Sequence, residues 1–321
     1  MYLKDRVTDP VAMRDAYCDT LIYLAEEHPG IVAIEVDVAA SMGTTRFAKK
    51  FPDRSVNCGI QEANAVGVAA GLALEGYTPF FHAFGIFATR RCFDQIFLSA
   101  GYQKAPIKIV GGDAGVTATA NGGTHMPFED VALMRAIPDM TIVDPADSQA
   151  VRALLPQLAY DCGNAYLRCS RKNMPMIYAP GATFKLGKAN VLREGTDVTL
   201  IAAGCEVNEA LTAAEMLEAE GISARVVDMF TIKPLDEECV IESVQKTGAI
   251  VTAENHNAIG GLGEAVCNVV ARRCPAPVEI IGVHESFGEV GTIDDLLKRF
   301  HLTAADICDA AKRAIARKTG A

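Results

Sequence analysis

Residues 58–76 read CGIQEANAVGVAAGLALEG, and this is the most informative stretch of the chain. One acid, Glu62, begins a run of small and apolar residues whose only other charge is Glu75, just before the closing Gly76. The run predicts a helix from Gln61 to Leu74, because glycine is a common residue just after a helix end. An acid buried at the start of such a helix is a candidate for proton transfer. An acid left in water there would be only a favourable partner of the helix dipole.

Strand-like and helix-like segments alternate along the rest of the chain. We expect strands at 31–36, 79–84, 107–110, 141–143, 198–202, 224–228 and 249–253. We expect helices at 12–27, 61–74, 91–101, 206–221 and 263–273. This alternation predicts an α/β fold with mainly parallel sheets.

Length and composition favour a two-domain globular protein. The chain has 321 residues, which is long for one hydrophobic core. A polar, turn-rich stretch divides it, so we expect domains at 1–180 and 197–321 with a linker at 181–196. The net charge of −10 argues against a nucleic-acid or anionic-membrane partner. No long apolar run or secretory signal is evident and the ten cysteines have no zinc-like spacing, so we expect a cytoplasmic protein with reduced thiols.

Two further segments contain candidate site residues. Phe84 and Phe87 follow a predicted strand in the sequence FHAFGIFATRRCFDQI, and their rings could stack on a flat heteroaromatic group or simply pack in the core. His125 lies in the loop NGGTHMPFED. A histidine in a glycine-rich loop can face a ligand and transfer protons near neutral pH, although most such histidines are surface residues.

These three segments together resemble the transketolase family of thiamine-diphosphate enzymes. The resemblance identifies Glu62 as the catalytic glutamate that hydrogen-bonds the aminopyrimidine of the cofactor. It implies that Phe84 and Phe87 hold the pyrimidine, with Asp37 near the thiamine site. The motif "GGTHMPFED" is similar to the family's "GPTHQ" loop, so His125 is implied as a catalytic residue that contacts the substrate hydroxyls.

The resemblance also implies a site for the terminal phosphate of a sugar. Arg14, Ser41 and Arg171 fall at positions that hold this phosphate in transketolases, and the planar arginine fork suits such an anion. Two positions differ from the family pattern. Asn121 stands where most transketolases have an aspartate that reads sugar stereochemistry, and Gly112 stands where a histidine is usual. We therefore expect Asn121 to contact the substrate, and the sequence does not identify the sugar.

The signature that binds the cofactor's diphosphate is missing from the sequence. Thiamine enzymes hold the diphosphate through Mg²⁺ with a Gly-Asp-Gly motif followed by asparagine, and we find no such pair. The resemblance covers only the pyrimidine-binding and C-terminal domains of a transketolase. We expect the C-terminal subunit of a split transketolase, which transfers a two-carbon ketol unit between sugar phosphates. The metal would be held by an N-terminal partner subunit, with a homodimer of this chain inside an α₂β₂ assembly.

Three alternatives share these domains. The β subunit of a 2-oxoacid dehydrogenase usually has "GHH" in the histidine loop, where this chain has "THMP". A deoxyxylulose-phosphate-synthase-like enzyme is not usually split. A non-catalytic regulatory subunit would have little reason to keep Glu62, because a buried acid without a task is costly. In the second domain, we interpret Glu254 and His256 as structural residues.

Overall fold

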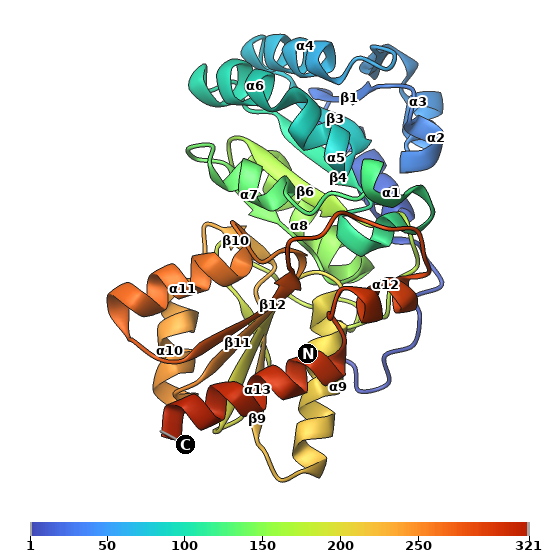
Figure 1. The fold of residues 1–321 in the computed structure, drawn as a ribbon. Helices are drawn as coiled ribbons and strands as arrows, with labels where there is room; N and C mark the ends of the chain where they lie inside the picture. The colour runs from blue at the N-terminus through green and yellow to red at the C-terminus, as the bar shows by residue number, and fades with distance from the viewer. Residues whose placement is uncertain (1, 320–321) are drawn as a thin grey trace.

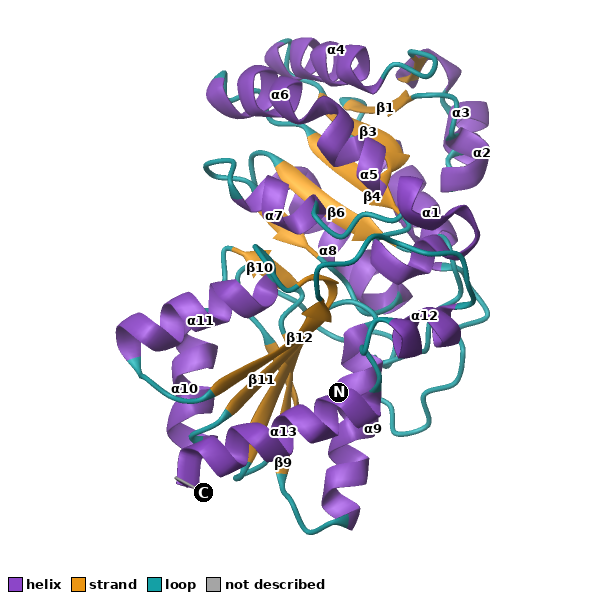
Figure 2. Cartoon of the chain, viewed as in Figure 1, coloured by secondary structure: helices purple, strands orange, loops and turns teal. Residues whose placement is uncertain are grey.

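Two sheets of mainly parallel strands form the two halves of the chain in the computed structural model, which describes residues 2–319 (Figures 1 and 2). The first sheet has seven strands in the order β10 (Thr231–Lys233), β5 (Thr141–Val143), β6 (Ala165–Cys169), β4 (Lys108–Gly112), β3 (Thr78–Phe84), β1 (Ile31–Glu35) and β2 (Ser55–Asn57). The second has five, in the order β12 (Val278–Val283), β11 (Ile250–Asn257), β8 (Val198–Ala202), β9 (Ala224–Asp228) and β7 (Asn190–Arg193). All neighbouring strands are parallel except the pairs β10–β5 and β7–β9.

Helices cover both sheets (Figure 2). The helices of the first half are α1 (Met13–Glu27), α2 (Ala39–Met42), α3 (Thr45–Lys50), α4 (Glu62–Leu74), α5 (Gly85–Thr89), α6 (Phe93–Gln95), α7 (Asp130–Arg135) and α8 (Ser148–Tyr160). Those of the second half are α9 (Glu206–Ala219), α10 (Glu237–Thr247), α11 (Leu262–Arg273), α12 (Ile293–Arg299) and α13 (Ala304–Thr319). Short 3-10 segments lie at η1 (Pro52–Arg54), η2 (Arg90–Cys92) and η4 (Gly115–Thr124), and η3 (Ile96–Tyr102) is a π-helix. No helix among the described residues is both long enough and apolar enough to span a bilayer.

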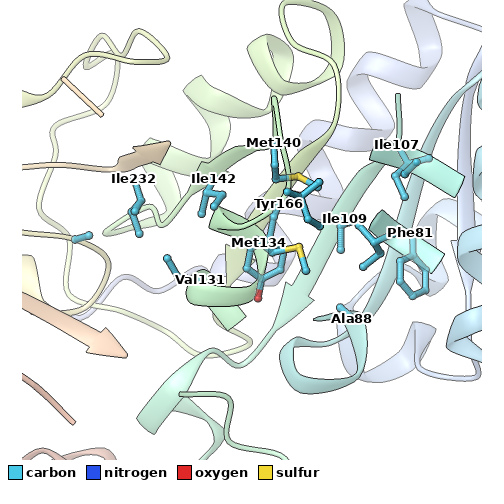
Figure 3. Packing of buried hydrophobic residues seen from close by; sticks show 14 of the residues in the cluster. Phe81, Ala88, Ile107, Ile109, Val131, Met134, Met140, Ile142, Tyr166 and Ile232 are labelled. Carbon is cyan, nitrogen blue, oxygen red and sulfur yellow. The ribbon is translucent and has the colours of Figure 1, made fainter. Parts of the chain in front are cut away.

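Buried apolar strands explain this arrangement. All five residues of β1 are buried, as expected for a parallel strand with helices on both faces. One face of the first sheet packs Phe81 and Ile109 against residues from the covering helices, including Ala88 and Met134 (Figure 3). Ile232, from β10, belongs to the same buried cluster. The core of the first half therefore includes a residue from the second half.

A buried arginine joins the two halves. The Arg168 side chain, on β6, is 2% exposed and donates from Nε to Asp130 at 2.8 Å and from Nη1 to Asp144 at 2.6 Å. Its Nη2 donates to the backbone carbonyl of Asn255, on β11, at 2.9 Å. Burial opposes ionisation of Asp130, but the Arg168 guanidinium beside it lowers the pKa of that carboxyl below its usual value.

The two-domain α/β prediction is confirmed, and two details of it are wrong. The expected helix 91–101 is divided among η2, α6 and η3, because Cys92 leaves the helical region with φ of −122° and ψ of 24° and the segment from Ile96 onward is a π-helix. The expected linker 181–196 contains β7, which pairs with β9 at the edge of the second sheet. Both errors concern short elements whose conformation is set by tertiary packing rather than by sequence period.

Candidate active site

The predicted site residues cluster at one edge of the first sheet. Asp37 comes shortly after β1, Phe84 ends β3 and Arg171 comes shortly after β6. Asp113, which the sequence analysis does not predict, follows β4 at the same edge. These strands are neighbours and parallel, so their carboxyl ends lie along the same edge. Ligands of open α/β sheets bind in crevices at this edge.

Glu62 is buried at the start of α4, as predicted. The residue is 4% exposed, and α4 buries Ala65 and Ala69 on the face toward the sheet. Arg91 Nη1 donates to Glu62 Oε1 at 2.9 Å, and its guanidinium lies 3.8 Å from the ring centre of Phe87. The sequence analysis does not predict this contact of Arg91 with Glu62, although Arg91 is the first residue of the predicted helix 91–101. A ligand that contacts both Glu62 and the face of Phe87 has to displace this arginine.

Two phenylalanines and one histidine form a cluster next to Glu62. The ring centres of Phe84 and Phe87 are 6.3 Å apart, and that of His125 is 5.9 Å from the first and 5.0 Å from the second. All three residues are half-buried, so each ring keeps some exposed surface. The structure thus brings together the three residues predicted to hold a pyrimidine ring and a sugar.

The loop that carries Asn121 and His125 is braced by the second half of the chain. Gly122 has φ of 66°, in the left-handed region that favours glycine. The Gly291 N–H donates to the Thr119 carbonyl at 3.3 Å, so the segment before α12 lies against this loop, as Figure 1 shows. Thr124 Oγ1 lies 2.9 Å from His125 Nδ1, and Asn121 is exposed on the same loop.

The three residues predicted to hold an anion lie on three adjoining segments. Arg14 Nη1 donates to the carbonyl of Ser41 at 2.7 Å, which joins α1 to α2. The Met13 N–H donates to the Lys172 carbonyl at 3.0 Å, so the start of α1 adjoins the segment that carries Arg171. Arg171 also lies 4.8 Å from the ring centre of Phe84. The anion residues and the aromatic cluster therefore form one continuous site.

Asp113 is a site residue that the sequence does not single out. It is 3% exposed and accepts from Arg171 Nε at 2.6 Å and from the Arg171 N–H at 2.9 Å. Asp37, in contrast, is exposed, and its carboxylate accepts from Asn57 Nδ2 at 2.6 Å. The loop after Asn57 leads directly to Glu62, so Asp37 lies at the margin of the site.

Glu254 and His256 are buried and hydrogen-bonded to backbone groups, which supports the interpretation of both as structural residues. The Glu254 carboxylate accepts from the N–H groups of Leu262 and Gly263 at 2.6 and 2.8 Å and so caps α11. Burial raises the pKa of Glu254 to about 7 and lowers the pKa of His256 to about 4. The ten cysteines all lie in the described part of the chain and are free thiols.

Family models define the class of this two-domain chain. Residues 9–176 match the transketolase pyrimidine-binding domain, and residues 187–307 match the transketolase C-terminal domain. The chain therefore belongs to the transketolase family, and its function is of the transketolase type. The family implies use of thiamine diphosphate.

Individual relatives include two transketolase subunits and a split gene transketolase of known structure. The chain is 47% identical to a 6-deoxy-6-sulfo-D-fructose transketolase subunit of Clostridium sp. (strain MSTE9), over 95% of each chain. It is 38% identical to an apulose-4-phosphate transketolase subunit of Phocaeicola vulgatus, over 94% of this chain and 96% of the relative. A solved structure described as a split gene transketolase, inactive beta4 tetramer, matches with a TM-score of 0.89 and 43% identity over 97% of this chain and 100% of that chain.

The site fits one half of thiamine diphosphate. A buried acid beside two half-exposed aromatic rings suits a flat ring with polar edges. Within residues 2–319 there is no group of three or more acidic, histidine or cysteine side chains placed to hold a metal ion. The pyrimidine half of the cofactor therefore has candidate ligands in this chain.

Proposed function

We propose that this chain is the C-terminal subunit of a split transketolase that transfers a two-carbon ketol unit from a ketose to an aldehyde. The observation that carries the proposal is the placement of buried Glu62 beside the cluster of Phe84, Phe87 and His125. Thiamine diphosphate, when bound, supplies the covalent chemistry of ketol transfer, and the protein supplies orientation and electrostatics.

Each clustered residue has a role that its position supports. Glu62 Oε1 holds or accepts a proton at the edge of the pyrimidine ring once Arg91 has moved aside. Phe84 and Phe87 fix the plane of the ring. His125 exchanges a proton with substrate hydroxyls, and exposed Asn121 contacts the sugar from the same loop.

A separate N-terminal subunit would hold the diphosphate and Mg²⁺. A diphosphate bound through a metal needs several oxygen ligands. The sequence lacks the Gly-Asp-Gly and asparagine signature for them, and the described residues contain no cluster of three or more acidic, histidine or cysteine side chains that could hold a metal ion. The names of the relatives support this arrangement, because two of them are called subunits and a third, a β₄ tetramer, is called inactive. We propose that the partner completes the site and that the complex acts in the cytoplasm.

We further propose that the chain forms a symmetric dimer within an α₂β₂ complex. The surface formed by α4 and η3 exposes several large apolar side chains, among them Leu74 at 60%, Leu98 at 48% and Tyr102 at 82%. Ile60, just before α4, is 71% exposed. A concentration of exposed apolar residues is typical of a protein–protein interface.

The substrate would be a sugar with a terminal anion. Arg14, Ser41 and Arg171 line the site at the end nearest Phe84, and arginines are suited to oxyanions. The relatives act, by their names, on a sulfonated ketose and on a sugar phosphate. Both a terminal phosphate and a terminal sulfonate are therefore candidates.

Reconstitution tests the proposal. The chain is combined with its N-terminal partner, thiamine diphosphate and Mg²⁺, and ketol transfer is measured on ketoses with and without a terminal anion. We expect turnover only when both subunits are present. Turnover of 2-oxoacids and not of ketoses would instead indicate a dehydrogenase β subunit, and binding without any turnover would indicate a regulatory subunit.

An arginine variant tests the anion site. Arg171→Ala should cost roughly 1.5–3 kcal/mol in kcat/KM on anionic sugars, as expected for a lost hydrogen bond to a charged group, and much less on neutral sugars. Lys172→Ala, a charge change at the next residue, is the matched control. Equal losses on anionic and neutral sugars would show that Arg171 does not contact the anion.

A further inference from the structure

Arg14, Arg171 and Asp113 of the anion subsite together carry one net positive charge, and this balance bears on which anion the subsite takes. Arg14 and Arg171 each contribute one positive charge. Asp113 contributes one negative charge and is almost fully buried against Arg171, with N···O distances of 2.6 and 2.9 Å. Two other carboxylates nearby have partners of their own. Asp15 Oδ1 lies 3.6 Å from Arg46 Nη2, and Asp37 Oδ1 accepts a hydrogen bond from Asn57 Nδ2.

The wall of the subsite at Gly112 is apolar. Met42 is 1% exposed, and its sulfur lies where a Cβ on Gly112 would have to be. Its methyl carbon is 3.0 Å from the same point. A side chain at position 112 would therefore require the thioether of Met42 to move, and in this structure that thioether occupies the space beside Gly112. The site cannot gain a second positive charge or an extra donor from this direction without moving Met42.

We infer that this subsite is matched to a singly charged terminal sulfonate, and that Asp113, Met42 and Gly112 set the match. This inference rests on the proposed function and names the substrate class more closely. A sulfonate carries one negative charge at every working pH and needs only hydrogen-bond donors, which two arginines supply. A phosphate monoester carries about −1.5 to −2 at pH 7, because its second pKa is near 6.

The excess charge of a phosphate is costly here for two reasons. Arg171 is half-buried and Asp113 is buried, so the subsite is less screened by water than an open surface. The Asp113 carboxylate also repels a doubly charged anion bound to the same arginine. The subsite compensates the charge of a sulfonate fully and that of a phosphate dianion only in part.

The experiment measures the ratio of kcat/KM for a ketose with a terminal sulfonate to that for its phosphate counterpart, on the reconstituted two-subunit complex from pH 5.5 to 8. General acid–base steps affect both substrates and cancel in the ratio. We expect the ratio to be at least one at pH 7.5 and to rise as pH increases through about 6, where the phosphate becomes a dianion. A ratio that favours phosphate about tenfold or more across the range would overturn the inference.

Variants make the test specific. Asp113→Asn removes the buried negative charge and should shift the ratio toward phosphate by about tenfold, which corresponds to about 1.4 kcal/mol. Gly112→His combined with Met42→Ala adds a donor and makes room for it, and should shift the ratio in the same direction. Asp19→Asn makes the same change at a half-exposed carboxylate that pairs with Arg46. It is the matched control and should leave the ratio unchanged.

The outcomes distinguish a failure of the sulfonate inference from a failure of the proposed transketolase function. If folded Asp113→Asn leaves the sulfonate-to-phosphate ratio unchanged, the charge of Asp113 does not set the preference for sulfonate. If a variant fails to fold, the pH dependence of the ratio in the wild-type complex tests the inference instead. A complex that transfers ketol units but prefers phosphate refutes only the inference. A complex that turns over neither substrate refutes the proposed function itself.

Discussion

Replacing Glu62 by glutamine separates a catalytic acid from a structural one. Glutamine keeps the shape of the side chain and can still accept the hydrogen bond from Arg91, but it cannot exchange a proton at pH 7. The ion pair it removes has one exposed partner, since the Arg91 side chain is 45% exposed. Such pairs contribute about 0.2–1 kcal/mol to folding, so the fold should survive. A general acid–base step is worth about 10²–10⁴ in rate, so turnover should fall at least ~100-fold.

The assay is ketol transfer by the reconstituted complex, with circular dichroism and thermal unfolding of the isolated chain to confirm that it folds. Glu75→Gln, at the exposed end of the same helix, is the matched control and should keep normal turnover. Near-normal turnover in folded Glu62→Gln would refute the reasoning. Glu62 would then be an acid whose function is to hold Arg91 at the start of α4.

Three further predictions concern stability and assembly. Burial raises the pKa of Asp228 to about 8, so between pH ~4 and ~8 the native state holds a proton that the unfolded chain releases. As the pH rises through this range, Asp228 should lower the free energy of unfolding by about 1.4 kcal/mol per pH unit. Urea titrations of Asp228→Asn at several pH values should lack this component. Arg168→Met leaves the carboxylates of Asp130 and Asp144 buried without their partner and should destabilise the chain by about 3–5 kcal/mol in calorimetry, and a loss below about 1 kcal/mol would show that the network is dispensable. The chain without its partner should bind thiamine diphosphate and Mg²⁺ only weakly, and micromolar binding in calorimetry would contradict the split site.

The sequence predicts the parts of the site that depend on local pattern. The burial of Glu62 follows from a run of alanine, glycine and valine that leaves one acid on an otherwise apolar helix. That prediction needs only the composition and period of one element. The clustering of Phe84 with Arg171 is different, because the sequence analysis predicts the strand before Phe84 but not β6 before Arg171. The structure shows that β4 lies between these two strands and that their carboxyl ends share one edge of the sheet.

Other parts depend on packing between distant segments. Arg91 reaches Glu62 only because the chain turns at Cys92, and no helical period contains that turn. Met42 fills the space beside Gly112 from a four-residue helix, 70 positions earlier in the chain. The sequence analysis does not single out Arg168, whose buried charge is stabilised by three acceptors from separate segments. Contacts of this kind are set by tertiary structure.

The three residues of β10 also decide where this polypeptide can be divided. A fragment ending near residue 180 would lose β10, which pairs with one side of β5, while β6 would still pair with the other side. The backbone groups of Thr141–Val143 that face β10 would then form an open edge able to pair with other molecules. The same fragment would leave Arg168 without the Asn255 carbonyl. The two halves of this chain should therefore fold properly only as one polypeptide, although the turn-rich stretch between them resembles a domain linker.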